Sequence, residues 1–360
     1  MKRTALALLC GLIGLPVCAS AADAVRAAPE RLVLVSTAAG NAQIYRIDGD
    51  GGLPVALTAG EYENTQPAWS PDGRRIAFTS MRDGNMELYV MDADGGGQRR
   101  LTDHPNPDNS PVWSPDGRSL VFVSYRDRHA NLFVVDVDGG EPVRLTDTPT
   151  DKGSPRWSPD GRQVLYTAFG EGRSQQLNLV EPGGTSLDLT TALSKDKKTQ
   201  AAWAPDGRAI AFVSVGKKGG ELYTLPVDGG EAQRLTSNAY DDAMPAWSPD
   251  GRRLAFVSNR YGKTVGRASG DIYLMDADGE LPVNITRDVV HEESPVWSAD
   301  GRTLYYLALQ EGRAQIHALT LDGGPARVLT GAEGQVLMFS VAPAPSETRT
   351  AAVVEAARAN

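Results

Sequence analysis

The chain has 360 residues, of which 41% are hydrophobic and 22% are charged, and its formal net charge is −9. An acidic chain repels nucleic-acid phosphates and anionic lipid head groups, so we expect no nucleic-acid partner. Beyond the N-terminus, no stretch approaches the roughly 20 apolar residues that a membrane-spanning helix needs. Composition therefore excludes the nucleic-acid-binding and membrane-spanning classes.

The N-terminus has the features of a secretory signal peptide. Lys2 and Arg3 precede the apolar run ALALLCGLIGLPVC, which ends at the small residues ASA. This order predicts a cleavable signal over residues 1–21, followed by a short linker over 22–30 and export to the periplasm. Val17 stands before Cys18, where a lipoprotein signal needs a small residue, which disfavours a lipid anchor. Both cysteines of the chain would leave with the signal, which excludes disulfides in the exported protein.

Six similar strings organise the rest of the chain, beginning with PAWSPDGRRIAF at 67–78. Their tryptophans follow one another at steps of 44, 44, 46, 44 and 50 residues. A period in this range indicates a repeat architecture. These tryptophans are predicted to pack between repeats: Trp69, Trp113, Trp157, Trp203, Trp247 and Trp297.

One repeat, residues 67–102, predicts four short strands. The first covers 67–69, and SPDG (70–73) follows as a tight turn because proline presets φ and glycine accepts positive φ. Apolar runs at 75–80 and 86–92 predict the second and third strands, and 98–102 predicts the fourth. Four antiparallel strands in about 44 residues make one blade of a β-propeller.

The two ends of the repeat region complement each other. Residues 31–58 match the last three strands of a repeat, and 336–343 supply a lone strand in which Phe339 takes the tryptophan position. Pairing of these segments would close the ring and remove open sheet edges. We therefore predict an all-β propeller over 31–342 with seven four-stranded antiparallel blades and terminal strand closure. Six blades is the alternative, and 343–360 is predicted to be a flexible tail.

The repeated W-S-P-D-G-R, with MDADGG after it, resembles the propeller repeat of the TolB family. The resemblance implies a periplasmic scaffold that binds envelope proteins, such as a peptidoglycan-associated lipoprotein. Family members that resemble TolB itself carry an α/β domain before the propeller, whereas this chain resembles a stand-alone propeller. The resemblance assigns a blade-forming role to the turn aspartates Asp72, Asp116, Asp160, Asp206, Asp250 and Asp300.

Related blades also occur beside prolyl-oligopeptidase domains and in oligogalacturonate lyases, and an enzyme of either class would need its own catalytic groups. The sequence contains no G-x-S-x-G elbow and no hydrolase domain. The four histidines, His104, His129, His291 and His317, fall on three blades without the close spacing of metal ligands. The DADGG-type turns lack the terminal glutamate of a calcium loop. We therefore expect no catalytic residue, metal or cofactor.

Carboxylates recur in the segments that lead into the first strands. A propeller places these segments around one mouth of its channel, where a ring of carboxylates would attract a cation or a basic partner segment. Ordinary solubility of polar loops is the alternative explanation. The candidates are Asp108, Asp151, Asp241, Asp242 and Glu292.

Two loops that break the regular period are basic, namely SKDKKTQ (194–200) and NRYGKTVGRASGD (259–271). Irregular loops on a rigid scaffold are common sites of binding specificity. The candidate partner contacts are Lys197, Lys198, Arg260, Tyr261, Lys263 and Arg267.

The sequence as a whole favours a non-catalytic periplasmic scaffold that binds an envelope protein or peptide. Two alternatives stay open: a metal-dependent oligosaccharide lyase or other glycan-active propeller enzyme, and a sensor or carrier of small ligands.

Overall fold

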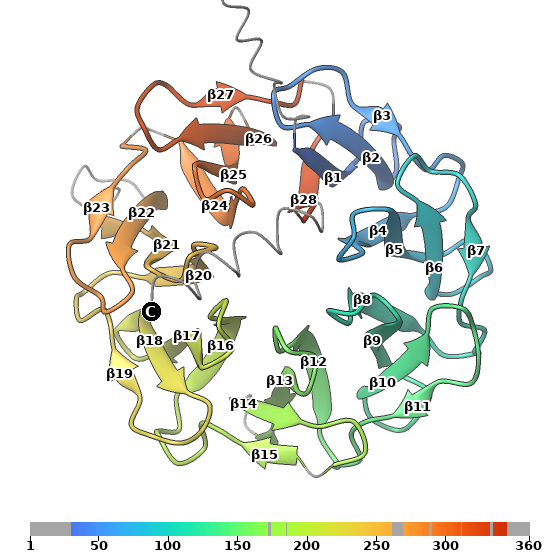
Figure 1. Cartoon of the computed structure of the whole chain (residues 1–360), viewed down its shortest axis with the longest axis horizontal. Coiled ribbons are helices and arrows are strands. Elements are labelled where there is room, and N and C mark those ends of the chain that lie inside the picture. Colours follow the sequence, from blue (N-terminus) through green and yellow to red (C-terminus); the bar gives the residue numbers. More distant parts are fainter. Residues whose placement is uncertain are drawn as a thin grey trace, which may run out of the picture.

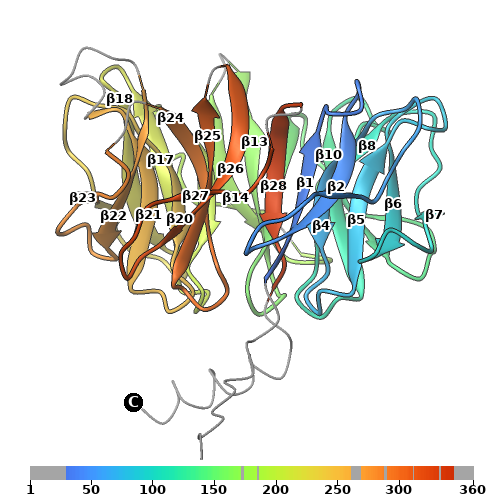
Figure 2. The ribbon, with the colours of Figure 1, turned by 90° about the horizontal axis from the view of Figure 1, so that it is seen from above.

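The computed structural model describes residues 30–343, apart from 172, 173, 185, 261–268, 288, 289, 311, 332 and 333. In this part of the chain, 28 β-strands form seven four-stranded sheets. The sheets stand as blades around a central opening (Figure 1), and a view from the side shows one flat ring (Figure 2). The predicted seven-bladed propeller is confirmed, and the six-bladed alternative is wrong. The predicted signal peptide, the linker up to residue 29 and the tail beyond 343 lie outside the described residues.

The blades are numbered along the chain, and each sheet pairs its strands in antiparallel order. Blade 1 contains β1 (Arg31–Ser36), β2 (Gln43–Asp48), β3 (Val55–Ala56) and β28 (Val336–Val341). Blade 2 contains β4 (Asn64–Trp69), β5 (Arg75–Ser80), β6 (Glu87–Asp92) and β7 (Arg99–Arg100). Blade 3 contains β8 (Asp108–Trp113), β9 (Ser119–Ser124), β10 (Asn131–Asp136) and β11 (Val143–Arg144).

The four remaining blades repeat this order, with the first strand of each next to the opening and the last at the rim (Figure 1). Blade 4 contains β12 (Asp151–Trp157), β13 (Val164–Phe169), β14 (Gln175–Val180) and β15 (Ser186–Asp188). Blade 5 contains β16 (Lys197–Trp203), β17 (Ala209–Gly216), β18 (Gly219–Pro226) and β19 (Gln233–Arg234). Blade 6 contains β20 (Asp242–Trp247), β21 (Arg253–Ser258), β22 (Asp271–Asp276) and β23 (Val283–Asn284). Blade 7 contains β24 (His291–Trp297), β25 (Thr303–Gln310), β26 (Arg313–Thr320) and β27 (Arg327–Val328).

The hydrophobic core lies between the blades. The second strands are apolar at successive positions, because neighbouring blades cover both faces of each sheet. Between blades 2 and 3, for example, Ala77 and Leu88 pack against Trp113 and Phe122. The Trp113 indole also donates a 2.9 Å hydrogen bond to the carbonyl of Ala68 in the preceding blade. The tryptophans therefore lie at the blade interfaces, where a buried indole supplies both area and a polar anchor.

The SPDG turn is held by its own side chains. In blade 3, Ser114 Oγ donates a hydrogen bond to Asp116 Oδ1 at 2.6 Å. Ser114 Oγ also accepts a hydrogen bond from the Ser119 amide at 3.0 Å. Gly117 takes φ +70°, a conformation that glycine adopts without steric cost. The serine and the aspartate together fix the turn that joins the inner strand to the second strand.

The inner strands begin about three residues earlier than predicted. In β4 the extra residues start at Asn64, and a bulge separates the Thr65–Thr79 pair from the Ala68–Ala77 pair. Gln66, inside the bulge, has φ +53°. The proline that follows has no backbone N–H to donate to the neighbouring strand. The alternation of apolar and polar residues is therefore interrupted here, and the start of the strand cannot be recognised from the sequence.

The ring closes as predicted, but with a different register. β28 pairs with β1, so the end of the described chain completes the first blade. Leu32, which corresponds to Ile76 in blade 2, faces Val341, whereas Ile76 faces Trp69. Val341 thus takes the tryptophan position, and the assignment of that position to Phe339 is wrong. The inner-strand bulge lies at a different place here: the β28 ladder runs without interruption from Met338 to Val341, and its register shifts between the Val35–Met338 and Ser36–Val336 pairs.

Candidate functional site

Two predicted acidic contacts are buried ion-pair partners instead. Asp108 and Asp242 open their inner strands, and both residues are 0% exposed. Arg126 Nη2 lies 2.9 Å from Asp108 Oδ2, and Arg260 Nη2 lies 3.1 Å from Asp242 Oδ2. Burial raises the pKa of Asp108, while the Ser124 hydrogen bond and the charge of Arg126 oppose that rise.

The two arginines are also held by aromatic rings of their own blades. The Arg126 guanidinium carbon lies 4.5 Å from the centre of the Phe133 ring, and that of Arg260 lies 4.8 Å from the Tyr273 ring. Cation–π contact and a buried carboxylate together fix each side chain in place. Arg260 was predicted in a free loop, but the structure uses it inside blade 6.

The other acidic candidates divide into one buried and two exposed residues. Glu292 is 0% exposed, and its carboxylate accepts hydrogen bonds from the Ile272 amide and the Thr286 hydroxyl. Asp151 and Asp241 are exposed and each accepts a backbone amide, from Ala130 and Gly220 respectively. The predicted ring of carboxylates that attracts a partner is therefore wrong for Asp108, Asp242 and Glu292, which are buried and bonded within the protein.

A buried lysine replaces the acid at the start of two inner strands. Lys152 donates to the carbonyls of Thr148 and Thr150, and Lys198 donates to the Asp196 carbonyl at 2.7 Å and Ser194 Oγ at 2.9 Å. Burial lowers the pKa of both lysines. Lys198 was predicted to contact a partner, but at 1% exposure it caps its own loop instead.

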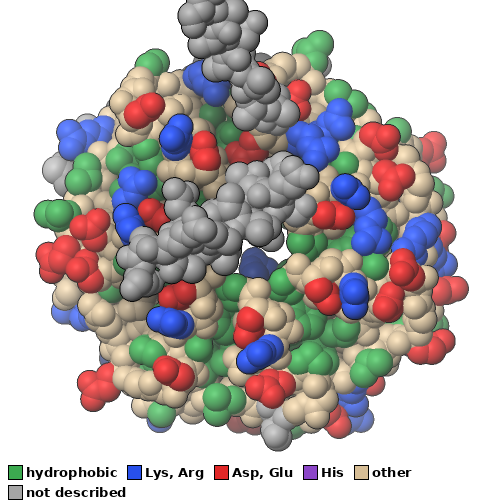
Figure 3. All heavy atoms as spheres, in the orientation of Figure 1, with side chains coloured by type: hydrophobic (Ala, Val, Ile, Leu, Met, Phe, Trp, Pro, Cys, Tyr) green, Lys and Arg blue, Asp and Glu red, His purple; other side chains and the backbone are tan. Residues whose placement is uncertain are grey.

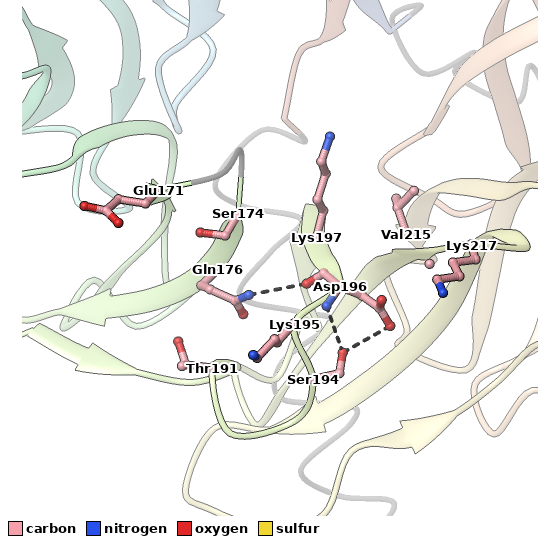
Figure 4. A pocket seen from close by; sticks show the side chains of 11 residues that line it. Glu171, Ser174, Gln176, Thr191, Ser194, Lys195, Asp196, Lys197, Val215 and Lys217 are labelled. Carbon is pink, nitrogen blue, oxygen red and sulfur yellow. Dashed lines mark hydrogen bonds between the residues drawn. The ribbon is translucent and has the colours of Figure 1, made fainter.

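A polar groove of about 670 Å³ lies where blades 4 and 5 meet, beside the longer 194–200 segment (Figure 4). Blade 4 contributes residues near the β13–β14 turn, and blade 5 contributes the start of β16 and the β17–β18 turn. Gln176 Nε2 donates to the Asp196 carbonyl at 3.3 Å, which links the two walls. The lining residues are Glu171, Ser174, Gln176, Thr191, Ser194, Lys195, Asp196, Lys197, Val215, Gly216 and Lys217.

The groove contains three exposed lysines, Lys195, Lys197 and Lys217, which make it positively charged. In Figure 4, Lys195 and Lys217 lie on either side of Asp196, whose carboxylate accepts a hydrogen bond from Ser194 Oγ at 3.2 Å. Among the residues that the structure describes, none of the three lysines forms an ion pair. Their donors are therefore available to a ligand that carries carboxylates, on a protein whose net charge is −9.

Only part of the predicted basic surface is brought together. Lys197 lines the groove, and Lys195 and Lys217, which were not among the predicted contacts, line it as well. Lys217 belongs to a turn of regular length, so the only available signal was its KKG sequence beside a β-hairpin. Tyr261, Lys263 and Arg267 lie outside the described residues, so their predicted role stays a prediction.

The histidines are dispersed in the described part of the chain. His291 Nδ1 accepts the Gly270 amide at 2.9 Å, and His317 lies 5.6 Å from the Tyr306 ring, measured between ring centres. Within the described residues, no group of three or more His, Cys, Asp or Glu side chains is placed to hold a metal ion. The same residues include no helix that could cross a membrane.

Comparison with known proteins places these features in a family. The sequence matches the family described as PD40, TolB beta propeller domain, over residues 18–198, 131–266 and 198–350. No curated protein matches the sequence significantly.

Three solved structures illustrate the range of similar folds. TolB from Acinetobacter baumannii is 21% identical with a TM-score of 0.57, over 89% of this chain and 69% of that chain. A puromycin-hydrolyzing peptidase from Mycobacterium tuberculosis is 16% identical with a TM-score of 0.67, over 83% of this chain but only 51% of its own. An oligogalacturonate lyase in complex with manganese is 18% identical with a TM-score of 0.64, over 84% of this chain and 86% of that chain. At these identities the similarity shows the fold alone.

Proposed function

Because the chain belongs to the TolB β-propeller family, we propose that it is a non-catalytic periplasmic scaffold that binds an envelope protein or peptide. The observation that carries the proposal is the groove between blades 4 and 5, where three lysines face solvent without an acidic partner among the described residues. We place the partner contact there. A peptidoglycan-associated lipoprotein is the first candidate, as the family resemblance implies.

The charges of the groove define the chemistry of the partner. Three lysines outnumber Glu171 and Asp196, so the groove is locally basic on an acidic protein. A segment with two or more carboxylates would be attracted to the groove and repelled elsewhere. Contacts of this kind set association rate and specificity more than affinity, so we expect binding to weaken as salt increases.

Capture from an envelope extract tests the proposal. The triple variant Lys195→Glu/Lys197→Glu/Lys217→Glu reverses the charge of the groove and should lose the partner. Lys218→Glu is the matched control, because Lys218 is exposed beside Lys217 but does not line the groove. A protein retained by wild type and control should be identified by mass spectrometry and bound again after purification. Equal retention by the triple variant would refute the groove as the contact.

The same lysines would also suit the carboxylates of an acidic oligosaccharide, the substrate class of the lyase with a similar fold. Incubation of the purified protein with trigalacturonate and manganese separates the two functions. Appearance of unsaturated products, which absorb in the ultraviolet, would replace the scaffold proposal with an enzymatic one. Binding without turnover would leave the scaffold in place and extend its partners to glycans.

A further inference from the structure

The position just before the tryptophan position of each inner strand holds a small residue in every blade except one. In the blade-by-blade alignment, the residue before each tryptophan is alanine or valine in five blades, and Ser340 holds the position in β28. The sixth tryptophan-bearing blade has Arg156 instead, in β12. The small residues are Ala68, Val112, Ala202, Ala246, Val296 and Ser340.

Arg156 reaches the space inside the ring. Its strand lies next to the central opening (Figure 1), and its side chain is exposed, whereas the six small residues at this position are half-buried. The opening is also visible with all heavy atoms drawn as spheres (Figure 3). Desolvation by the surrounding protein lowers the pKa of the Arg156 guanidinium, although the residue as a whole is in contact with solvent. Exposure to water combined with protein on all sides is the situation of a side chain in a channel.

Most N–H donors of the Arg156 guanidinium form no hydrogen bond with the described residues. Its one hydrogen bond to a described residue runs from Nη1 to the carbonyl of the preceding Pro155, at 2.9 Å. A guanidinium carries five N–H donors, so most of those of Arg156 have no protein acceptor among the described residues. No carboxylate of the described chain lies within ion-pair distance of Arg156.

Exposed polar residues lie on the strand of Arg156 and on the inner strand of the next blade. Ser154 and Gln200 are exposed on the same two neighbouring strands, β12 and β16. Both occupy the inner-strand bulge with positive φ, 54° and 53°. The Gln200 side-chain oxygen already accepts the Met244 amide at 2.8 Å, so its amide group is anchored beside the channel. The corresponding position of the other six blades carries a half-buried alanine or valine or, in β28, a serine.

We propose that Arg156 makes the central channel a binding site for a carboxylate, inserted end-on from a small acid or from the C-terminus of a peptide. A guanidinium binds a carboxylate through two parallel hydrogen bonds, which the free donors permit. A monoanion balances the single positive charge, whereas a phosphate dianion would leave one negative charge unbalanced. The small uncharged residues at the same position of the other blades add no competing charge.

This site is separate from the groove of the proposed function. In the alignment of β12 with β16, Arg156 corresponds to Ala202, five residues after Lys197. A rise of about 3.3 Å per residue places the two sites roughly 16 Å apart along the channel axis. Loss of one site therefore need not affect the other, and variants of the two can be tested independently.

Trp203 provides a spectroscopic probe, because its indole N–H donates to the Arg156 carbonyl at 3.2 Å. The full-length protein, with its indole resonances assigned, should be titrated with acetyl-triglycine and with the amide of the same peptide. A second titration with galacturonate distinguishes a peptide carboxylate from a sugar acid. We expect a saturable shift of the Trp203 indole signal with at least one acid and no shift with the peptide amide.

Three variants complete the test. Arg156→Ala installs the residue that other blades carry, so it should fold, and it should bind the acid at least about tenfold more weakly. Arg156→Lys keeps the charge without the fork and should retain part of the affinity. Arg162→Ala removes an exposed arginine of the next turn and should bind like wild type. Equal binding of acid and amide, unchanged affinity in Arg156→Ala, or no response to either acid would overturn the proposal.

Discussion

Arg126 in blade 3 and the buried Asp108 at the start of the same blade form a partly buried ion pair across 18 residues of chain, with 2.9 Å between Nη2 and Oδ2. The next blade has Lys152 at the aspartate position and Gly170 at the arginine position. The positive charge therefore stands at the arginine position in blade 3 and at the aspartate position in blade 4. The start of the inner strand therefore holds one cation in each of these two blades. The cation pairs with a carboxylate in blade 3 and donates to loop carbonyls in blade 4.

This relationship predicts a large effect of removing the acid. Asp108→Ala should lower the free energy of unfolding by about 3 kcal/mol, because it leaves Arg126 partly buried without its partner. Denaturant titration measures the change, and the double variant Asp108→Ala/Arg126→Ala should lose less than the two single effects added together. Asp103→Ala is the control, since that carboxylate is 84% exposed in its pair with Arg100 and should matter by under about 1 kcal/mol. Strict additivity in the double variant would show that the pair is not coupled.

The repeated turn predicts a stabilising substitution. Blade 5 has Ala204 where the other SPDG-type turns have serine, so the turn lacks the serine hydroxyl that bonds the aspartate and the amide of the next strand. Asp206 Oδ1 already accepts the Arg208 amide at 3.0 Å, so it stands ready for the added donor. Ala204→Ser should raise the free energy of unfolding by about 1 kcal/mol.

The reverse substitution, Ser114→Ala, provides the matched control. It should cost a similar amount, about 1 kcal/mol, because it removes the same two hydrogen bonds from blade 3. Destabilisation by Ala204→Ser would mean that blade 5 has no room for the hydroxyl.

The turn aspartates also predict the acid limb of the stability profile. The Ser114 hydroxyl and the Arg118 amide hold the pKa of Asp116 below its usual value of 3.8, and Ser158 and Arg162 do the same for Asp160. A carboxyl whose pKa is lower in the folded state adds stability above its unfolded pKa, and that stability is lost as the pH falls toward the folded pKa. We therefore expect stability to decline below about pH 4. Carboxyl titration by NMR should show both pKa values below 3.8 in the wild type, and a return of the Asp116 pKa toward 3.8 in Ser114→Ala; an unchanged value in the variant would contradict the assigned cause.

The sequence was sufficient to predict the number of blades and the order of their strands. It was not sufficient to predict where the inner strands begin or which side chains meet there. Second and third strands are continuous apolar runs, and the SPDG turns fix their ends, so blade number and strand order followed from periodicity. The inner-strand starts did not, because residues such as Gln66 adopt a positive φ before a proline and break the pattern. The burial of Asp108 depends on Arg126, which only the fold brings into contact. Arg156 was accessible to sequence reasoning, since the aligned repeats show alanine or valine in its place, but nothing in one strand says that the position faces a channel.

Ring closure predicts a sharp limit to truncation at the C-terminus. β28 supplies the inner strand of blade 1, and the last described bond of the closure runs from the Ala342 amide to the Arg31 carbonyl at 2.7 Å. A chain that ends after Pro343 keeps these bonds, so it should unfold at the temperature of the full-length protein. A chain that ends after Gln335 exposes the edge of β1 and uncovers Leu34, which is 1% exposed in the ring. We expect that variant to lose its cooperative transition or to self-associate through the open edge, because an unpaired strand accepts another chain. Calorimetry and light scattering on the two truncations provide the measurement, and a native-like transition in the shorter chain would show that six blades suffice without closure.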